Sequence, residues 1–445
     1  MLLWICDSST GAFVVPCSTA SRRSRGIARA VTIMIAFAIA ATSSRAQPTD
    51  TPDDFDHWRE RFRDRARSQG IPEAVFDRAF EGVAPDAVVL DKDRNQPEFT
   101  KQPWAYLQIA VSKRLDDGRR LVREHRKALD QAAKRHGVPA ETIAAVWGVE
   151  SAYGKNTGEY LAVRSLATLA FEGRRREYFE GELLAALRIL SAGDVPPDAM
   201  RGSWAGALGQ AQFMPSSYLE LAVDGDGDGR RDLWGTLPDV FGSIANFLIE
   251  RGWRTGEAWG TVVRLPEGFD IGLADGDTRR DVRAWAGLGV RRGDGTPLAD
   301  GAAIREDMPG ALYLPAGARG PAALLFGNFD AFLAYNPGQA YALALGFLSD
   351  ALATGIDPVA GATWPVDEPA LTRDQKVELQ TLLLERGFDP GAPDGVLGRR
   401  TRAALREYQR TIGVPPDGFP TVTLLERLRQ TGGDSGTTSE PPPSR

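Results

Sequence analysis

The feature with the clearest chemical potential is a glutamate that interrupts an apolar helical pattern. Residues 138–142 predict a helix start, with proline in the first turn. Apolar side chains follow at Ile143, Val146 and Trp147, and Glu150 continues the same stripe, because positions three, four and seven apart share one helix face. Desolvation raises the pKa of a buried carboxyl group, which suits a general acid near neutral pH. A solvated or hydrogen-bonded glutamate at a helix end is the alternative, and periodicity alone favours that alternative.

Residues 202–217 form a second candidate segment, rich in Gly, Ala and Ser and interrupted by Gln and aromatic side chains. This composition is poor for a core or a helix and is typical of a loop whose backbone approaches a ligand closely. Ser203 and Gln212 offer neutral hydrogen-bonding groups there, which suit a polar, uncharged sugar. A tight helix-packing turn is the structural alternative for each residue taken alone.

Together these segments resemble the membrane-bound lytic murein transglycosylase B family. The matching motifs lie at residues 148–150, 165–171, 174–179, 202–207, 212–217, 335–336 and 341–342. The likeness extends from about Phe55 to about Thr354. Several separated motifs in one order are more specific than any one of them, so the resemblance predicts a lysozyme-like, mainly α catalytic domain.

The resemblance also implies a reaction. In that family one Glu protonates the glycosidic oxygen between N-acetylmuramic acid and N-acetylglucosamine, and no second carboxylate serves as nucleophile. The substrate's own acetamido group attacks the anomeric carbon, and the same Glu then acts as a base while the C6 hydroxyl closes a 1,6-anhydro ring. Substrate-assisted enzymes of this kind are exceptions to the two-carboxylate scheme. The implied acid and base is Glu150, and the chemistry requires no cofactor.

A set of cleft residues follows from the same resemblance. Ser203 and Gln212 are expected near the reacting sugar, and Tyr335, Asn336 and Tyr341 are expected to frame the glycan. Aromatic rings cover sugar faces while their hydroxyl groups form hydrogen bonds.

Four further residues are implied at the edges of this cleft. Arg174 and Arg175 match a basic pair that could meet an acidic peptide stem, although an exposed pair of arginines would be unremarkable. Phe247 stands where the family often has Tyr, so a stacking face remains and a hydroxyl group is lost. Tyr106 is a further candidate for the cleft wall.

Residues 224–239, here called the acidic loop, open like an EF-hand calcium loop, with Gly229 at the sixth position. The twelfth position is Gly235 and not the usual bidentate Glu, but the resembling family has a longer loop that closes with an Asp. The predicted metal ligands are therefore Asp224, Asp226, Asp228, Arg230 and Asp239. Carboxylates at alternate positions repel one another without a cation, so a structural Ca²⁺ is favoured over a bare acidic turn.

Residues 1–46 are predicted to be a signal peptide, with four arginines at 22–29, an apolar run at 30–41 and a small-x-small cleavage site at 44–46. The apolar run is too short to remain as a span of the bilayer's roughly 30 Å hydrocarbon core. Both cysteines, Cys6 and Cys17, lie in this leader. The predicted mature protein is therefore periplasmic, without a thiol, a lipid-anchor cysteine or a permanent membrane span.

The formal net charge of the chain indicates which classes of binding partner to expect. The leader carries five Arg and one Asp, so the formal net charge falls from −6 for the whole chain to −10 without the leader. An acidic protein is a poor partner for nucleic acid, and three His in the chain make a zinc hydrolase improbable. Peptidoglycan glycan strands are the expected partner, and we expect a monomer.

The domain organisation is predicted as a catalytic domain at 47–356, with a small β-containing insertion at about 257–326, and a Pro/Gly-rich linker at 357–371. A capping box at Thr372 and two Asp-Gly turns, at 394–395 and 417–418, then resemble a three-helix peptidoglycan-binding domain at 372–430. A generic three-helix bundle is the alternative. Residues 431–445 lack apolar side chains and are predicted to be a disordered tail.

Three functions remain open at this stage. The leading interpretation is a lytic transglycosylase whose C-terminal domain, tethered by the linker at 357–371, raises the local concentration of glycan. A hydrolytic muramidase would instead deliver water to the anomeric carbon. A non-enzymatic wall-binding scaffold is the third possibility, and the presence of Glu150, Ser203 and Gln212 speaks against it.

Overall fold

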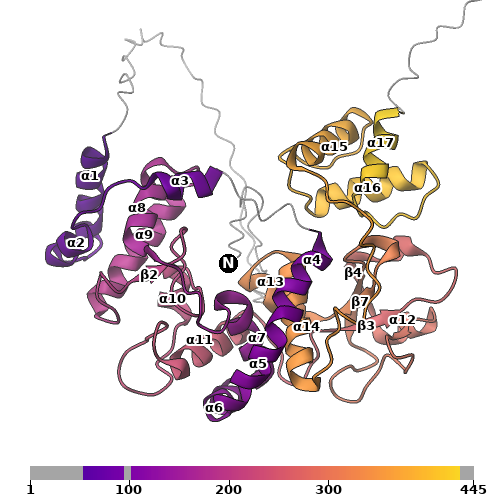
Figure 1. The fold of residues 1–445 in the computed structure, drawn as a ribbon, viewed down its shortest axis with the longest axis horizontal. Helices are drawn as coiled ribbons and strands as arrows, with labels where there is room; N and C mark the ends of the chain where they lie inside the picture. The colour runs from indigo at the N-terminus through magenta and orange to yellow at the C-terminus, as the bar shows by residue number, and fades with distance from the viewer. Residues whose placement is uncertain (1–53, 95–101, 431–445) are drawn as a thin grey trace, which may run out of the picture.

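The computed structural model describes residues 54–94 and 102–430, so the predicted signal peptide and the predicted C-terminal tail lie outside the described residues. Helices dominate the fold (Figure 1). Those of the catalytic part are α1 (Phe55–Ser68), α2 (Glu73–Ala79), α3 (Ala87–Arg94), α4 (Pro103–Leu107), α5 (Lys113–Glu124), α6 (Arg126–His136), α7 (Ala140–Ser151), α8 (Ala162–Glu172), α9 (Arg176–Ala192), α10 (Pro215–Leu221), α11 (Leu237–Glu250), α13 (Gly327–Tyr335) and α14 (Gln339–Thr354), with a π-helix η2 (Gln108–Ser112) between α4 and α5.

Helix α7 is the centre of the catalytic part, where it contacts α5, α6, α11 and α14. All of its residues except Glu141 are buried. A hydrogen bond of 2.9 Å between Thr142 Oγ1 and Ser349 Oγ joins it to α14. A helix in the core of a protein is buried on every face, whereas a surface helix is buried along one stripe. The apolar periodicity predicted one buried stripe, whereas Glu150 is buried because the whole helix is enclosed.

The insertion forms an antiparallel sheet with the strand order β4-β6-β7-β3-β5. The strands are β3 (Gly260–Arg264), β4 (Asp275–Asp281), β5 (Arg291–Arg292), β6 (Pro309–Tyr313) and β7 (Ala322–Leu325), and α12 (Val282–Gly287) follows β4. A separate apolar cluster that includes Trp285, Leu312 and Phe326 stabilises this unit. A second, two-stranded sheet pairs β1 (Tyr160–Leu161) with β2 (Arg201–Gly202) beside the Gly-rich segment.

The C-terminal helices α15 (Arg373–Glu385), α16 (Arg399–Thr411) and α17 (Val422–Gln430) surround their own core, which includes Leu379, Leu405 and Leu425. Thr372 forms the predicted capping box with Gln375. The mainly α architecture with a small β-containing insertion and a C-terminal three-helix domain is thus confirmed.

The segment between α14 and α15, predicted as a Pro/Gly-rich linker, is packed against the rest of the protein. Val359 is buried in the catalytic core, and Trp364 Nε1 donates a hydrogen bond of 2.9 Å to its carbonyl oxygen. Arg319 of the insertion pairs with Asp367 at 2.6 Å, and Gln102 Nε2 donates to Pro369 O at 3.0 Å. These contacts make the segment a packed strap, although its composition is typical of a loop.

The C-terminal domain also contacts the rest of the protein directly. Ala318 N donates a hydrogen bond of 2.9 Å to Asp417 Oδ2. The rings of Trp104 and Phe419 lie 6.4 Å apart, centroid to centroid. In Figure 1 helices α15 to α17 lie beside the strands of the insertion. The domain is therefore docked, and a freely moving tether does not describe it.

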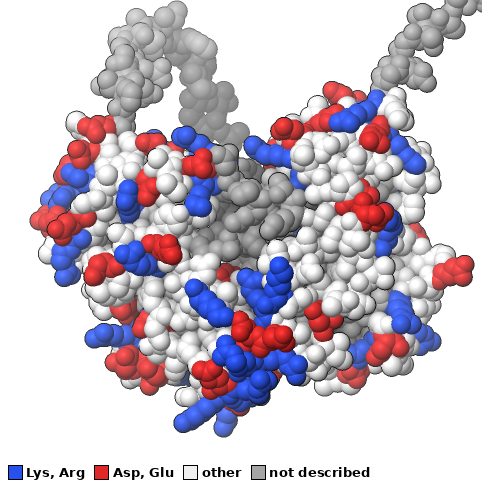
Figure 2. Space-filling model, in the orientation of Figure 1, with Lys and Arg blue, Asp and Glu red and all other residues white. Residues whose placement is uncertain are grey.

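The described surface in Figure 2 mixes Lys and Arg with Asp and Glu. Many of these charges form local pairs, such as Arg126 of α6 with Glu141 of α7 at 2.7 Å. Among the described residues, no helix is both long enough and apolar enough to cross a membrane.

Candidate active site

Glu150 lies in the last turn of α7 and is 8% exposed. Burial raises the pKa of its carboxyl group from an ordinary value of 4.5 to about 7, and this effect outweighs the hydrogen bond from Tyr341 and the charge of Arg114, which both lower the pKa. A carboxyl group with such a pKa is half protonated near neutrality, so it can give up a proton and later take one back.

Two tyrosines of the predicted set lie around this carboxyl group. Tyr341, near the start of α14, donates its phenolic hydrogen to Glu150 Oε1. Tyr335, at the end of α13, donates to Ala211 O at 2.6 Å and so fixes the Gly-rich segment. Desolvation and the charge of Glu150 raise the pKa of both phenols well above the usual range. Both side chains therefore remain neutral hydrogen-bond donors.

Arg114 also belongs to the site, although no sequence pattern indicated it. Its Nε donates to Gly148 O at 2.9 Å and its Nη1 donates to Ile109 O at 2.6 Å. It thereby connects α7 to the π-helix η2, and short π-helical bulges are frequent at functional sites. Tyr153, which follows α7 with φ of +60°, donates its hydroxyl to Arg114 O at 3.2 Å. A Cβ atom at Gly148 would lie 2.6 Å from Tyr153 Cζ, so glycine is required there.

Gln210 is a second residue that the sequence analysis missed. Its Oε1 accepts a hydrogen bond of 2.7 Å from Trp147 Nε1, and its Nε2 donates one of 2.7 Å to Trp234 O. Its backbone N–H donates to Leu233 O at 2.7 Å. One buried side chain thus joins the catalytic helix to the end of the acidic loop. Because the three partners are distant in sequence, local sequence patterns carry no signal for this contact.

Ser203 and Gln212 occupy different environments from one another. Ser203 is fully buried, and its Oγ accepts hydrogen bonds from Ala205 N (3.2 Å) and Ala207 N (2.9 Å), so it shapes its own turn and does not line an open surface. Gln212 has φ of +52°, a left-handed conformation that non-glycine residues rarely adopt. Its Nε2 donates to Thr157 O at 2.9 Å, and its buried Oε1 accepts no hydrogen bond from the described residues. A substrate N–H or hydroxyl group could satisfy that acceptor.

Of the remaining cleft candidates, Phe247 is buried within a cluster of packed aromatic rings. The ring of Phe247 lies 4.4 Å from Tyr335 and 5.5 Å from Phe213, centroid to centroid. Tyr106 is half-buried against the core and lies near enough to Tyr341 to influence its pKa. Asn336 is buried, and its Oδ1 accepts a hydrogen bond of 3.0 Å from Gly338 N. Asn336 therefore stabilises the turn between α13 and α14.

Arg174 and Arg175, the predicted basic pair, contact different residues. Arg174 Nε forms an ion pair with Asp93 Oδ2 at 3.3 Å, while most of its side chain is exposed. Arg175 stacks on Tyr178, with its guanidinium carbon 4.1 Å from the ring centroid. Arg174 is thus already engaged by Asp93, whereas Nη1 of Arg175 is buried and forms no hydrogen bond with the described residues.

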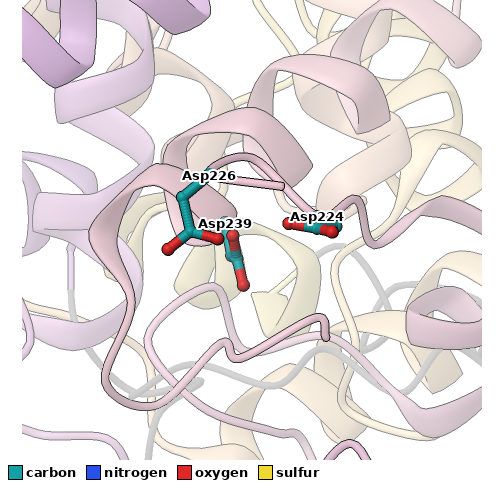
Figure 3. Close-up of side chains that lie close together, drawn as sticks. All are labelled: Asp224, Asp226 and Asp239. Atoms are coloured by element: carbon teal, nitrogen blue, oxygen red, sulfur yellow. The ribbon is translucent and has the colours of Figure 1, made fainter. Parts of the chain in front are cut away.

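The acidic loop brings three of the five predicted metal ligands together (Figure 3). Carboxylate oxygens of Asp224, Asp226 and Asp239 lie within 4.8 Å of one another. Burial raises the pKa of Asp239, and the nearby charge of Asp226 raises it further. Asp228 lies outside this cluster, and its carboxylate accepts a hydrogen bond of 2.8 Å from Arg230 N. A hard cation suits an all-oxygen set and would offset the repulsion.

Comparison with known proteins identifies both parts of the chain. Residues 54–350 match the Transglycosylase SLT domain family, and residues 372–428 match a putative peptidoglycan binding domain. The structure of SltB3 from Pseudomonas aeruginosa, in complex with NAG-anhNAM-pentapeptide, superposes with a TM-score of 0.80 at 47% identity, covering 84% of this chain and 99% of SltB3.

Two Escherichia coli proteins are also similar. Membrane-bound lytic murein transglycosylase B of strain K12 is 41% identical over 152 residues, which cover 33% of this chain and only 42% of that protein's length. The lytic transglycosylase Slt35, in complex with calcium, superposes with a TM-score of 0.56 at 28% identity, covering 67% of this chain and 93% of Slt35. By its fold, its motifs and these matches, the chain belongs to the SLT-domain family of lytic transglycosylases and carries a peptidoglycan-binding domain at its carboxyl end.

Proposed function

We propose that this protein is a lytic murein transglycosylase that cleaves the β-1,4 bond from N-acetylmuramic acid to N-acetylglucosamine and leaves a 1,6-anhydro product. The observation that carries the proposal is the enclosed Glu150 carboxyl group, whose pKa of about 7 fits one residue acting first as acid and then as base. A mechanism with one protein carboxyl group, in place of the two-carboxylate scheme, is what the family resemblance implies.

Each residue of the site has its own role in the proposed reaction. Glu150 protonates the bridging oxygen, while Tyr341 holds Oε1 of the carboxyl group and stabilises it once the proton has left. The substrate acetamido group attacks from within the same molecule, so its effective concentration is high. Gln212 presents an acceptor that no described residue engages, and Phe247 supports the ring of Tyr335 by packing against it. Glu150 then removes the proton of the C6 hydroxyl as the anhydro ring closes.

Mass spectrometry of muropeptides released from purified sacculi tests this function. We expect products lighter by one water than the products of a muramidase, because the ring closure replaces hydrolysis. Products of full hydrolytic mass would refute the transglycosylase and support the hydrolase. Wall binding without any release would support the scaffold.

We also propose that the acidic loop binds Ca²⁺ through Asp224, Asp226 and Asp239, supported by their convergence and by the calcium complex of Slt35. The ion would hold the end of the loop, from which Trp234 O accepts the hydrogen bond of Gln210. It supplies structure and takes no part in proton transfer. Thermal unfolding with and without Ca²⁺ tests this site.

The place of action proposed is the periplasm, with residues 1–46 as the export signal and peptidoglycan as the partner. The wall-binding match at 372–428 supports the partner, and the cell-wall relatives support the compartment. N-terminal sequencing of the exported protein tests cleavage after Ala46.

A further inference from the structure

The C-terminal domain presents a row of arginines toward the catalytic part. Arg399, Arg402 and Arg406 follow one another on α16 at intervals of three and four, so they share one face of the helix. Together with Asp275 and Asp277, they line a pocket between α16, strand β4 of the insertion and the first residue of α14. Arg399 Nε forms an ion pair with Asp277 Oδ1 at 3.2 Å.

The other two arginines have no such partner. Neither Arg402 nor Arg406 forms a hydrogen bond or an ion pair through its guanidinium group with a described residue. Arg406 is nevertheless only 9% exposed, and burial lowers the pKa of its guanidinium group. None of its guanidinium nitrogens is among the fully buried polar atoms that lack a partner in the described residues, so these N–H donors remain accessible to a ligand in the pocket. This pair of arginines is therefore suited to binding an anion.

The acidic residues of the pocket are already engaged elsewhere. Asp275 accepts from Asp277 N (2.8 Å), Thr278 N (2.7 Å) and Thr278 Oγ1 (2.6 Å). Asp417 accepts from Gln409 Nε2 at 2.7 Å and from Ala318 N at 2.9 Å. Their charges lie close enough to moderate the arginines, but their oxygens serve other donors. The guanidinium groups of Arg402 and Arg406 are therefore available to bind two oxygen atoms of a ligand.

The pocket is shaped around one of these side chains. Gly418 has φ of +67°, and a Cβ atom there would lie 2.9 Å from Arg406 Nη1. The opposite wall includes Tyr313 of β6 and Gln339, the first residue of α14. Two residues further along α14, Tyr341 contacts Glu150. The pocket therefore adjoins the helix that frames the candidate active site.

We propose that this pocket binds a carboxylate of the peptide that peptidoglycan strands carry, through the guanidinium groups of Arg402 and Arg406. The inference rests on the proposed function, because that function supplies the peptide-bearing strand. Arginine recognises carboxylates with two parallel hydrogen bonds, which gives geometric selectivity as well as attraction. The docked C-terminal domain then contributes directly to substrate selection, since one wall of the pocket is α16.

The test compares two substrates, purified glycan strands that carry peptides and the same strands after enzymatic removal of the peptides. For Arg402→Gln we expect the KM ratio of peptide-bearing to stripped strands to rise about tenfold, the order of effect of a charge-assisted hydrogen bond. Arg400→Gln is the matched control, because Arg400 lies on the same helix and pairs with Asp389. That control should leave the ratio unchanged.

A purely structural role for the arginines predicts a different pattern. If Arg402 only attracts the acidic strand β4, the two substrates will be affected equally, and Arg399→Gln will reproduce the loss by breaking the ion pair with Asp277. Either result overturns the proposal. Limited proteolysis of segment 357–371 shows whether a variant undocks the domain, and Arg406→Lys, which keeps the charge but loses the fork, provides a second substitution within the pocket.

Failure of the proposed function gives a separate signature. A wild type that releases nothing from either substrate refutes the transglycosylase. Sedimentation of the protein with peptide-bearing strands then still tests the pocket: binding by the wild type that weakens about tenfold in Arg402→Gln supports it, and equal binding by the two proteins refutes it.

Discussion

The hydroxyl group of Tyr341 offers a quantitative test of how the site sets the pKa of its acid. In Tyr341→Phe the ring remains, while the hydrogen bond to Glu150 Oε1 is lost. That hydrogen bond stabilises the charged carboxylate and so lowers its pKa, against the larger effect of burial. Its removal should therefore raise the pKa of Glu150 further.

The size of the shift follows from the energy of the bond. A hydrogen bond to a charged group contributes about 1.5 to 3 kcal/mol. Because one pKa unit corresponds to about 1.4 kcal/mol, the pKa should rise by about 1 to 2 units. The wild-type carboxyl group has a pKa of about 7. The protonated form is the active acid, so activity falls as pH rises through the pKa, and the variant should keep its activity to about pH 8 or 9.

The assay is kcat/KM for a soluble glycan between pH 5 and 10, because this parameter reports the free enzyme. Tyr408→Phe is the matched control, since Tyr408 lies in the core of the C-terminal domain. The control should keep the alkaline limb of the wild type. An alkaline limb that stays in place or moves to lower pH in Tyr341→Phe would refute this account of the pKa.

Three further predictions concern stability. Glu150→Gln should raise the Tm at pH 8 and leave it nearly unchanged at pH 4. The folded pKa of about 7 lies above the unfolded value of 4.5, so the cost of burying the charged carboxylate, up to about 3 kcal/mol, develops as pH rises between these two values. Equal shifts at both pH values would contradict burial of the charge. Gln210→Ala leaves Trp147 and Trp234 without their hydrogen-bond partner, so urea unfolding should show a loss of about 2 kcal/mol or more, and a loss within error would mean that the contact is dispensable. Millimolar Ca²⁺ should raise the Tm of the wild type relative to EDTA and have little effect on Asp239→Asn, whereas identical responses would exclude the acidic loop as the site.

Local patterns predicted the elements well because their signals are short-range. The helix that carries Glu150, the capping box at Thr372 and the apolar runs of the insertion each depend on neighbours a few residues away. The reason for burial was nevertheless incomplete, because α7 is enclosed on all faces, and a single stripe does not describe it. The role assigned to Glu150 depends on the family resemblance and remains a prediction.

The rest of the site depends on contacts between residues that are far apart in sequence. Tyr341 meets Glu150 across 191 positions, and Gln210 meets Trp147 across 63. No periodicity or turn signal encodes such pairs, so Arg114 and Gln210 were missed. Composition predicted a linker at 357–371 but carried no signal for the contacts that pack this segment against its neighbours.

The central claim is that one enclosed carboxyl group performs both proton transfers. The most direct measurement is the rate of release of anhydromuropeptides from purified sacculi by wild type and by Glu150→Gln, side by side, with equal folding verified by circular dichroism. The amide keeps the shape of the side chain but cannot transfer a proton at neutral pH, so we expect release to fall by at least about a hundredfold. Release by Glu150→Gln at the wild-type rate would contradict the account.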